Sequence, residues 1–484
     1  MRGWIHMQRP SWRVTFLARS TRRLFSAQNS VHHIRVPCAS SGEITVSLNN
    51  ITQNPQSTDP LVIWIPPFSQ HNSSSSNSSH PIPSWLQRYP AAVINYRWVS
   101  MDDNPLPSTS PPARELTSAM PTPFHWPTPL ADVFFGYSWI LDSLSPPDGG
   151  HRDIYVVGSY LGASLATSLA LTESRTDRPM TVRGLVSYNG IYDWTTFLPG
   201  HPIQHAKPPK GKQRFASTLQ QNQPENEGGP MFQVLRQLTP DLFDKPANLF
   251  DPFASACLFF QSPPLHVPPD FETSMNDVSS SSDSLSAAIG ALSLHGGNDY
   301  LENDASPIRR QEIPISMKPP RKGYLSFPPR KSTLVIPDTF LLSSSPSRYT
   351  ATPTPSTADK TSHLFGLGPA GKTIVRRKPP TMKKQKQEKN NFAVQASELA
   401  WLMQRSVATM ELKERMRLEP EFEDFDARVL EAERRVQLES MALDDTNLDV
   451  EGDSYFGLSA QGEGMVVEWL EEKIEEGRKN GTKK

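Results

Sequence analysis

The feature that most restricts the fold of this chain is a strand-turn-helix segment built around Gly158 and Gly162. The mostly apolar residues 153–157 have the length of a buried strand, and the small residues after Gly162 open a helical stretch that runs to Thr172. Glycines on both sides of the turn allow a strand and a helix to approach closely. A further strand is expected at 182–188. Strands and helices then alternate with short links, which predicts an α/β fold: a mostly parallel sheet with helices on both faces.

Earlier segments fit the same alternation of strands and helices. Residues 33–37 and 43–48 alternate in polarity and predict two antiparallel strands. The continuous apolar runs 61–65 and 92–96 predict strands that are buried on both faces. Apolar residues recur at helical spacing over 130–144, which predicts a helix with one buried face.

The later part of the chain is interrupted by polar segments, but apolar patterns return between them. The elements expected there are, in order, two short helical segments at 231–238 and 246–260, a strand at 334–342 that crosses Pro337, a helix at 392–410, a strand at 435–438 and a helix at 466–474. No internal repeat is present in the sequence.

Composition indicates one core rather than several domains. Only 36% of the 484 residues are hydrophobic and 47 are prolines, which fits a core of about 250–300 residues with long disordered insertions. We divide the chain, in order, into a leader at 1–30, the first part of the core at 31–262, a disordered insertion at 263–330, a core strand at 331–345, a basic linker at 346–390, and C-terminal helices with the last strand at 391–478.

Several classes of protein are disfavoured by the sequence. The net charge of −1 gives no overall field that would steer the chain to nucleic acid or to a membrane. Two cysteines, Cys38 and Cys257, are too few for a disulfide framework or a thiolate zinc cluster. We expect no metal or cofactor. No run of 18 apolar residues is present, so no transmembrane segment is expected.

The N-terminus has the composition of a mitochondrial transit peptide. Residues 1–35 contain seven arginines, and the first acidic residue is Glu43. Apolar residues interleave with the arginines near Trp12, as in an amphipathic helix, and Arg23 lies three residues before a possible cleavage site at Ser26. We expect a mitochondrial protein, most simply in the matrix. The alternative is a basic tail without a targeting role.

The segment 154–166 carries a resemblance to a known family. Gly158-Ser159-Tyr160-Leu161-Gly162 stands in register with the Gly-x-Ser-x-Gly elbow of the α/β-hydrolase superfamily. The chain resembles uncharacterised α/β-hydrolase-like proteins of fungal mitochondria over residues 32–262, and over 330–475 by element order only. The resemblance implies the hydrolase sheet, with Tyr160 at the position of the nucleophile.

The resemblance also shows which catalytic groups are missing. A tyrosine hydroxyl is large and weakly nucleophilic, so Tyr160 is a poor substitute for serine. The loop that should supply the oxyanion-hole N–H groups contains Pro66 and Pro67, which have none, and leaves Phe68 or Ser69 as a donor.

The acid and the base are missing as well. No carboxylate follows the strand expected to end near Leu342, and Asp338 stands before its end. No histidine occurs after His363, which is the one candidate for the family's His-x-Phe segment and is otherwise a linker residue. The four departures together predict a vestigial elbow without catalysis.

Three functions follow from these observations. The first is a catalytically inactive protein with a binding or assembly role in mitochondria, which meets a protein or RNA partner through the basic run 372–389 or the acidic stretch 419–453, unless these are solvated linkers. The second is an esterase or lipase-like hydrolase with an atypical site that uses Ser159 or Ser164 with His363. The third is a ligand carrier in which Tyr160 donates a hydrogen bond to a bound carbonyl.

Overall fold

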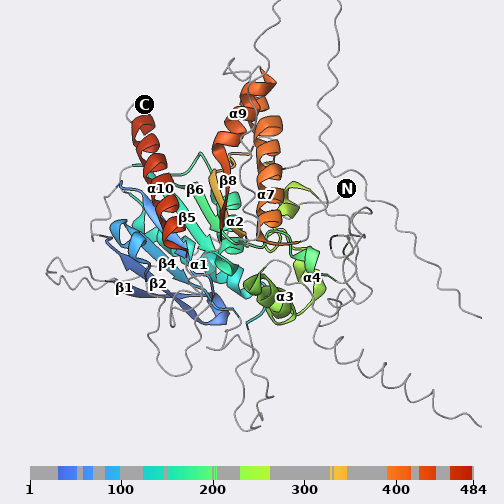
Figure 1. Ribbon diagram of the computed structural model, residues 1–484. Helices are drawn as coiled ribbons and strands as arrows, with labels where there is room; N and C mark the ends of the chain where they lie inside the picture. Colours follow the sequence, from blue (N-terminus) through green and yellow to red (C-terminus); the bar gives the residue numbers. More distant parts are fainter. Residues whose placement is uncertain are drawn as a thin grey trace, which may run out of the picture.

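A computed structural model describes residues 31–51, 58–68, 82–98, 124–146, 150–198, 201, 203, 229–261, 327–329, 332–345, 390–415, 424–442 and 458–481. The strands within these residues form one eight-stranded sheet in the order β1-β2-β4-β3-β5-β6-β7-β8 (Figure 1). The predicted α/β architecture is confirmed.

The strands agree with the alternating and continuous apolar patterns to within a few residues. They are β1 His32–Pro37, β2 Glu43–Asn49, β3 Leu61–Ile65, β4 Ala91–Asn95, β5 Arg152–Ser159, β6 Met180–Tyr188, β7 Asp338–Ser345 and β8 Val436–Ala442. β2 pairs antiparallel with both β1 and β4, and every other pairing is parallel. β3, in the middle of the sheet, is covered on both faces, which explains why all of its residues are apolar.

Helices cover both faces of the sheet. One face carries α1 (Thr128–Leu144), α2 (Leu161–Glu173) and α7 (Phe392–Ser406), while the other carries α10 (Ala460–Gly481) (Figure 1). The 3-10 helix η2 (Ser84–Arg88) lies beside α10, where Arg88 is 3.4 Å from Glu471. Trp469 of α10 stacks on Phe340 of β7 with ring centroids 5.8 Å apart. Gly184 of β6 makes room for that indole, because an added Cβ would lie 3.0 Å from it.

The structure describes eight further helical segments. They are the 3-10 helices η1 (Ala39–Ser41) and η3 (Trp194–Phe197), the helices α3 (Pro230–Phe243), α4 (Pro246–Leu249) and α5 (Cys257–Phe260), the π-helical turn η6 (Val407–Glu411), α8 (Leu412–Arg415) and α9 (Phe425–Arg435). The helical patterns expected at 231–238 and 392–410 are therefore present, whereas the segment 246–260 is helical only at its two ends, in α4 and α5.

The strand expected at 334–342 begins later and ends later than the sequence indicates. β7 starts at Asp338 because Pro337 has no N–H to give to the ladder. Leu334 forms only a single bridge with Arg175. Phe327 falls in the segment expected as an insertion, yet its side chain is buried with its ring 5.3 Å from that of Phe260.

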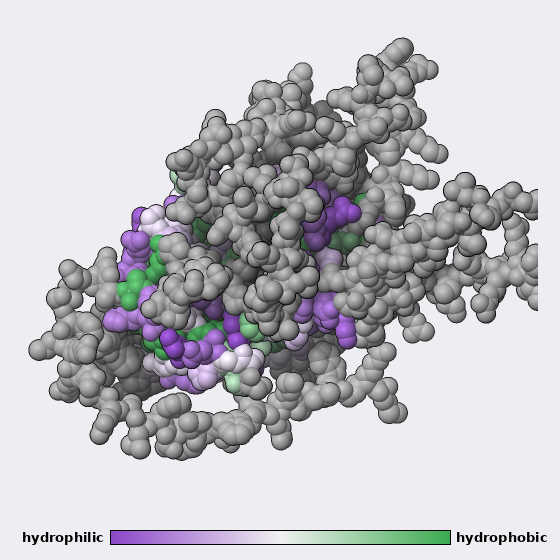
Figure 2. All heavy atoms as spheres, turned by 90° about the horizontal axis from the view of Figure 1, so that it is seen from below, coloured by the Kyte–Doolittle hydropathy of each residue, from purple (hydrophilic) through white to green (hydrophobic). Residues whose placement is uncertain are grey.

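Several predicted segments lie outside the described residues. These are the leader at 1–30, nearly all of the insertion at 263–330, and the basic run 372–389, while the acidic stretch is described only at 424–442. Within the described ranges, no helix is both long enough and apolar enough to span a bilayer. On the face seen in Figure 2, hydrophobic side chains form small areas among hydrophilic ones.

Candidate active site

The turn between β5 and α2 has the strained geometry of a nucleophile elbow. Tyr160 lies at its tip with φ 51° and ψ −114°, a conformation that costs a residue with a side chain about 1–3 kcal/mol. A Cβ on Gly162 would collide with the carbonyl oxygens of Ile65 and Pro66, and one on Gly158 would collide with the carbonyl group of Gly162. The two glycines therefore keep the turn tight, as the sequence predicts.

The ring of Tyr160 is enclosed by other aromatic rings. Phe68 stacks on it with centroids 5.9 Å apart, and the rings of Tyr188 and Phe392 meet it edge to face, each at 5.7 Å. Only 6% of Tyr160 is exposed. Aromatic pairs of this kind each contribute about 0.5–1.5 kcal/mol beyond their buried area, so the rings fill and stabilise the place above the elbow.

The hydroxyl of Tyr160 contacts an amide rather than a base. Nδ2 of Asn189 donates to it at 3.3 Å, and Oδ1 of Asn189 accepts the backbone N–H of Ser344 at 2.8 Å. Burial, and next the neighbouring phenol of Tyr188, raise the pKa of Tyr160 well above its ordinary value. The phenol is therefore protonated at neutral pH, and Asn189 cannot accept its proton.

The loop at the position of the oxyanion hole directs a phenylalanine side chain toward the elbow. Phe68 is buried, and its ring lies against Tyr160. The carbonyl oxygen of Pro66 accepts the hydroxyl of Tyr96 at 3.1 Å, which fixes this loop to the end of β4. Ser69, the other expected donor, lies outside the described residues.

The structure places Asp338 away from the elbow. It is the first residue of β7 and pairs with Gly184, whereas the elbow follows the carboxyl end of β5. In a parallel sheet these are opposite ends, so the candidate acid does not belong to the site. The side chain of Asp338 lies 4.0 Å from Arg183 instead.

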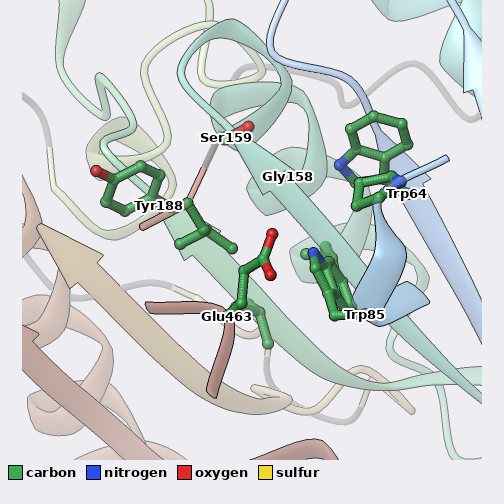
Figure 3. A pocket seen from close by; sticks show the side chains of 10 residues that line it. Trp64, Trp85, Gly158, Ser159, Tyr188 and Glu463 are labelled. Carbon is green, nitrogen blue, oxygen red and sulfur yellow. The ribbon is translucent and has the colours of Figure 1, made fainter. Parts of the chain in front are cut away.

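Neither alternative serine is placed as a nucleophile. The Oγ of Ser164 donates to the backbone carbonyl of Ile191 at 2.6 Å, and this side chain is buried. Ser159 faces the opposite side of the sheet from Gly158, because neighbouring residues of a strand alternate, and it lines a small separate cavity (Figure 3).

Histidine is absent from the immediate surroundings of these hydroxyls. In the part of the chain that the structure describes, no histidine hydrogen-bonds to Tyr160, Ser159 or Ser164. His363 lies outside that part. The same described residues contain no group of three or more histidine, cysteine, aspartate or glutamate side chains that could hold a metal ion.

Two residues of the site could not be assigned from the sequence. Asn189 has a φ of 50°, for which asparagine before glycine is a recognisable signal, but its contact with Ser344 depends on the pairing of β6 with β7. Phe392 lies more than 200 residues after Tyr160, and only the position of α7 brings the two rings together.

Comparisons with known proteins give distant structural relatives. No protein-family model matches the chain, and no curated protein matches it significantly. An esterase of Pyrobaculum calidifontis is 15% identical, with a TM-score of 0.26 over 50% of this chain and 64% of its own. A carboxylesterase cloned from a metagenomic library is 15% identical, with a TM-score of 0.28 over 48% of this chain and 66% of its own. Carboxyl esterase 2 of Tuber melanosporum is 12% identical, with a TM-score of 0.27 over 49% of this chain and 63% of its own. The chain thus spans less than two thirds of each of these enzymes.

The class of fold is defined by the sheet itself. Eight strands in this order, with β2 antiparallel to its neighbours and a strained elbow between β5 and α2, form the α/β-hydrolase fold. The fold alone does not fix an activity, since one fold carries many functions. The function is therefore inferred from the residues at the elbow.

Proposed function

We propose that this chain is a catalytically inactive protein of α/β-hydrolase fold with a binding or assembly role in mitochondria. The observation that carries the proposal is the ring of Tyr160, which stands at the nucleophile position between Phe68, Tyr188 and Phe392. A buried aromatic cluster at this position leaves no room for an acyl group.

The chemistry of the same residues supports inactivity. Acyl transfer needs a nucleophile with an adjacent base, and the partners of the Tyr160 hydroxyl are the amide of Asn189 and the phenol of Tyr188, whose pKa burial raises. It also needs N–H donors for the oxyanion, and Pro66 and Pro67 have none. The retained strain at Tyr160 keeps an esterase as the second candidate, because the backbone still has the conformation of an active elbow.

A binding role is supported by exposed apolar side chains on adjacent elements near the C-terminus. Leu430 of α9 is 69% exposed, Phe425 of the same helix 54% and Leu438 of the edge strand β8 38%. They lie in the described part of the acidic stretch 419–453. A protein partner with an apolar centre and a basic rim would fit them. The basic run 372–389 offers a second contact, for RNA or an acidic protein surface.

Catalysis is tested with the purified full chain. We expect no labelling by a fluorophosphonate probe and no turnover of short and long p-nitrophenyl esters. Labelling that disappears in Ser159→Ala or Ser164→Ala would establish the esterase instead. The variant Tyr160→Ser is a sharper form of the test: it places serine at the elbow tip, and we expect it to stay inactive because no base is adjacent.

The binding role is tested by capture from mitochondria. The tagged chain, cross-linked before lysis, is expected to recover a defined partner, and Leu430→Gln is expected to lose it. Phe135→Gln is the matched control, because Phe135 is also exposed, at 37%, but lies on α1. A partner that is recovered equally by both variants would remove the α9 surface from the proposal, and the absence of any stable partner would contradict the binding role.

The mitochondrial location is tested separately. Residues 1–30 fused to a fluorescent reporter are expected to direct it to the matrix, since the segment is rich in arginine and free of acidic residues. Replacing Arg13, Arg19, Arg22 and Arg23 by glutamine should leave the reporter in the cytosol. A reporter that stays cytosolic with the native segment would refute the location.

A further inference from the structure

A cavity lies on the α10 face of the sheet, behind the elbow rather than above it. It is bordered by Trp64 of β3, Trp85 of η2, Ser159 and Tyr188 at the ends of β5 and β6, and Glu463 in the first turn of α10 (Figure 3). Its free volume is about 60 Å³. Sites for drug-sized ligands have about 300–1,000 Å³, so this cavity suits a small group.

Glu463 gives the cavity a negative charge without a partner. Figure 3 shows its carboxylate directed into the space between Trp85 and Tyr188. Within the described ranges, no side chain donates a hydrogen bond or presents a cation to this carboxylate, and burial raises its pKa. A carboxylate that is partly removed from water and unpaired is costly, so a bound cation would be stabilised there.

The remaining lining selects the kind of cation. Apart from Glu463, the hydroxyl that borders it is that of Ser159, which is buried and has no hydrogen bond of its own in the described structure. The Tyr188 hydroxyl points away from the space, so this residue contributes its ring (Figure 3). A divalent metal ion needs about six oxygen ligands and would find one carboxylate. The indole rings of Trp64 and Trp85 instead suit a cation with an organic part, which aromatic rings attract.

We propose that this cavity binds a primary alkylammonium group, whose N–H bonds go to Glu463 and Ser159 and whose alkyl chain lies against Trp64 and Trp85. The group could belong to a free amine or to a lysine side chain of another protein, since both present the same head. The site is independent of the proposed loss of catalysis, because it lies on the other face of the sheet from the helix α2 that follows the elbow.

Binding is tested by saturation-transfer NMR on the full chain with n-butylammonium, and with n-butanol as a neutral ligand of similar shape. We expect saturable binding of the ammonium and not of the alcohol. Glu463→Gln should weaken the binding about tenfold, because a charge-assisted hydrogen bond is lost while the shape is kept. Glu468→Gln is the matched control: it removes the same charge from an exposed position of α10 and should bind as the native chain does.

The source of the group is tested with Nα-acetyl-lysine methylamide. Binding of this compound with the same dependence on Glu463 identifies a lysine side chain, whereas binding of butylammonium alone identifies a free amine. The proposal is overturned if butylammonium does not saturate, or if it binds equally to the native chain and to a Glu463→Gln variant with an unchanged melting temperature.

Discussion

The side-chain oxygen of Gln395 accepts the backbone N–H of Asp193 at 2.9 Å, across 202 positions of sequence. The same oxygen accepts the N–H of Tyr192 at 3.1 Å, and the amide nitrogen donates to Thr196 and Asn390 at 3.1 and 2.9 Å. One buried amide therefore fixes the start of α7 to the loop after β6, and through α7 it holds Phe392 against Tyr160.

Replacing Gln395 should loosen this attachment. Gln395→Ala leaves two buried backbone N–H groups without an acceptor, and we expect the free energy of unfolding to fall by about 2–4 kcal/mol in urea titration. Gln437→Ala is the control, because its side chain bonds to the carbonyl of Arg434 at an exposed site. If the free energy of unfolding falls by the same small amount in both variants, the amide contributes little to the attachment of α7.

The contributions of the Tyr160 ring and hydroxyl can be separated. Tyr160→Ala empties the aromatic cluster and should cost about 3–5 kcal/mol of stability, as other removals of a buried aromatic ring do. Tyr160→Phe keeps the ring and loses the hydrogen bonds of the hydroxyl to Asn189 and Tyr188, which should cost about 1–2 kcal/mol. Thermal and urea unfolding measure both, and a larger loss in the phenylalanine variant would mean that the hydroxyl has a role beyond packing.

The elbow glycine is expected to be intolerant of any side chain. In Gly162→Ala the new methyl group meets the backbone carbonyls of Ile65 and Pro66, which cannot move aside, so we expect little folded protein on expression. Gly464→Ala is the opposite case. That position lies within α10 with nothing near its Cβ, and alanine should stabilise the helix by about 1 kcal/mol in thermal unfolding.

A partly buried carboxyl makes stability depend on pH. Burial, and next the charge of Asp193, raise the pKa of Glu398 to about 7. Between its ordinary pKa and this value the unfolded chain releases the proton while the folded chain keeps it, so the free energy of unfolding falls as pH rises through that window. Unfolding titrations at several pH values measure the slope. Glu398→Gln should flatten it, and a slope that is unchanged in this variant would assign the effect to other groups.

The sequence predicted the first part of the sheet because β3 to β6 are rich in apolar residues and have the length of strands, and that signal is local. The start of β7 is predicted too early, because Leu334 to Ile336 are as apolar as a strand. Only the pairing shows that the chain before Pro337 is irregular and that the strand begins after this proline. The missing nucleophile was also readable, because the elbow is one continuous segment containing Tyr160.

What surrounds Tyr160 was not readable, because its neighbours are brought together by distant pairings. Ser344 reaches Asn189 only through the register of β6 with β7, and Phe392 arrives on a helix. Asp338 was considered as an acid for the opposite reason: it is near the expected position in sequence but at the other end of its strand. Glu463 gave no signal, since a glutamate in a first helical turn is ordinary.

The stacking of Trp469 on Phe340 also sets an order of events during synthesis. The strands from β3 to β6 are complete once residue 188 has been made, but the helix that covers one of their faces starts at Ala460. A nascent chain therefore lacks part of the cover of this apolar face through more than half of its translation, and exposed surface of this kind is what chaperones bind. A ribosome that stalls before α10 is finished leaves a chain that cannot bury that face.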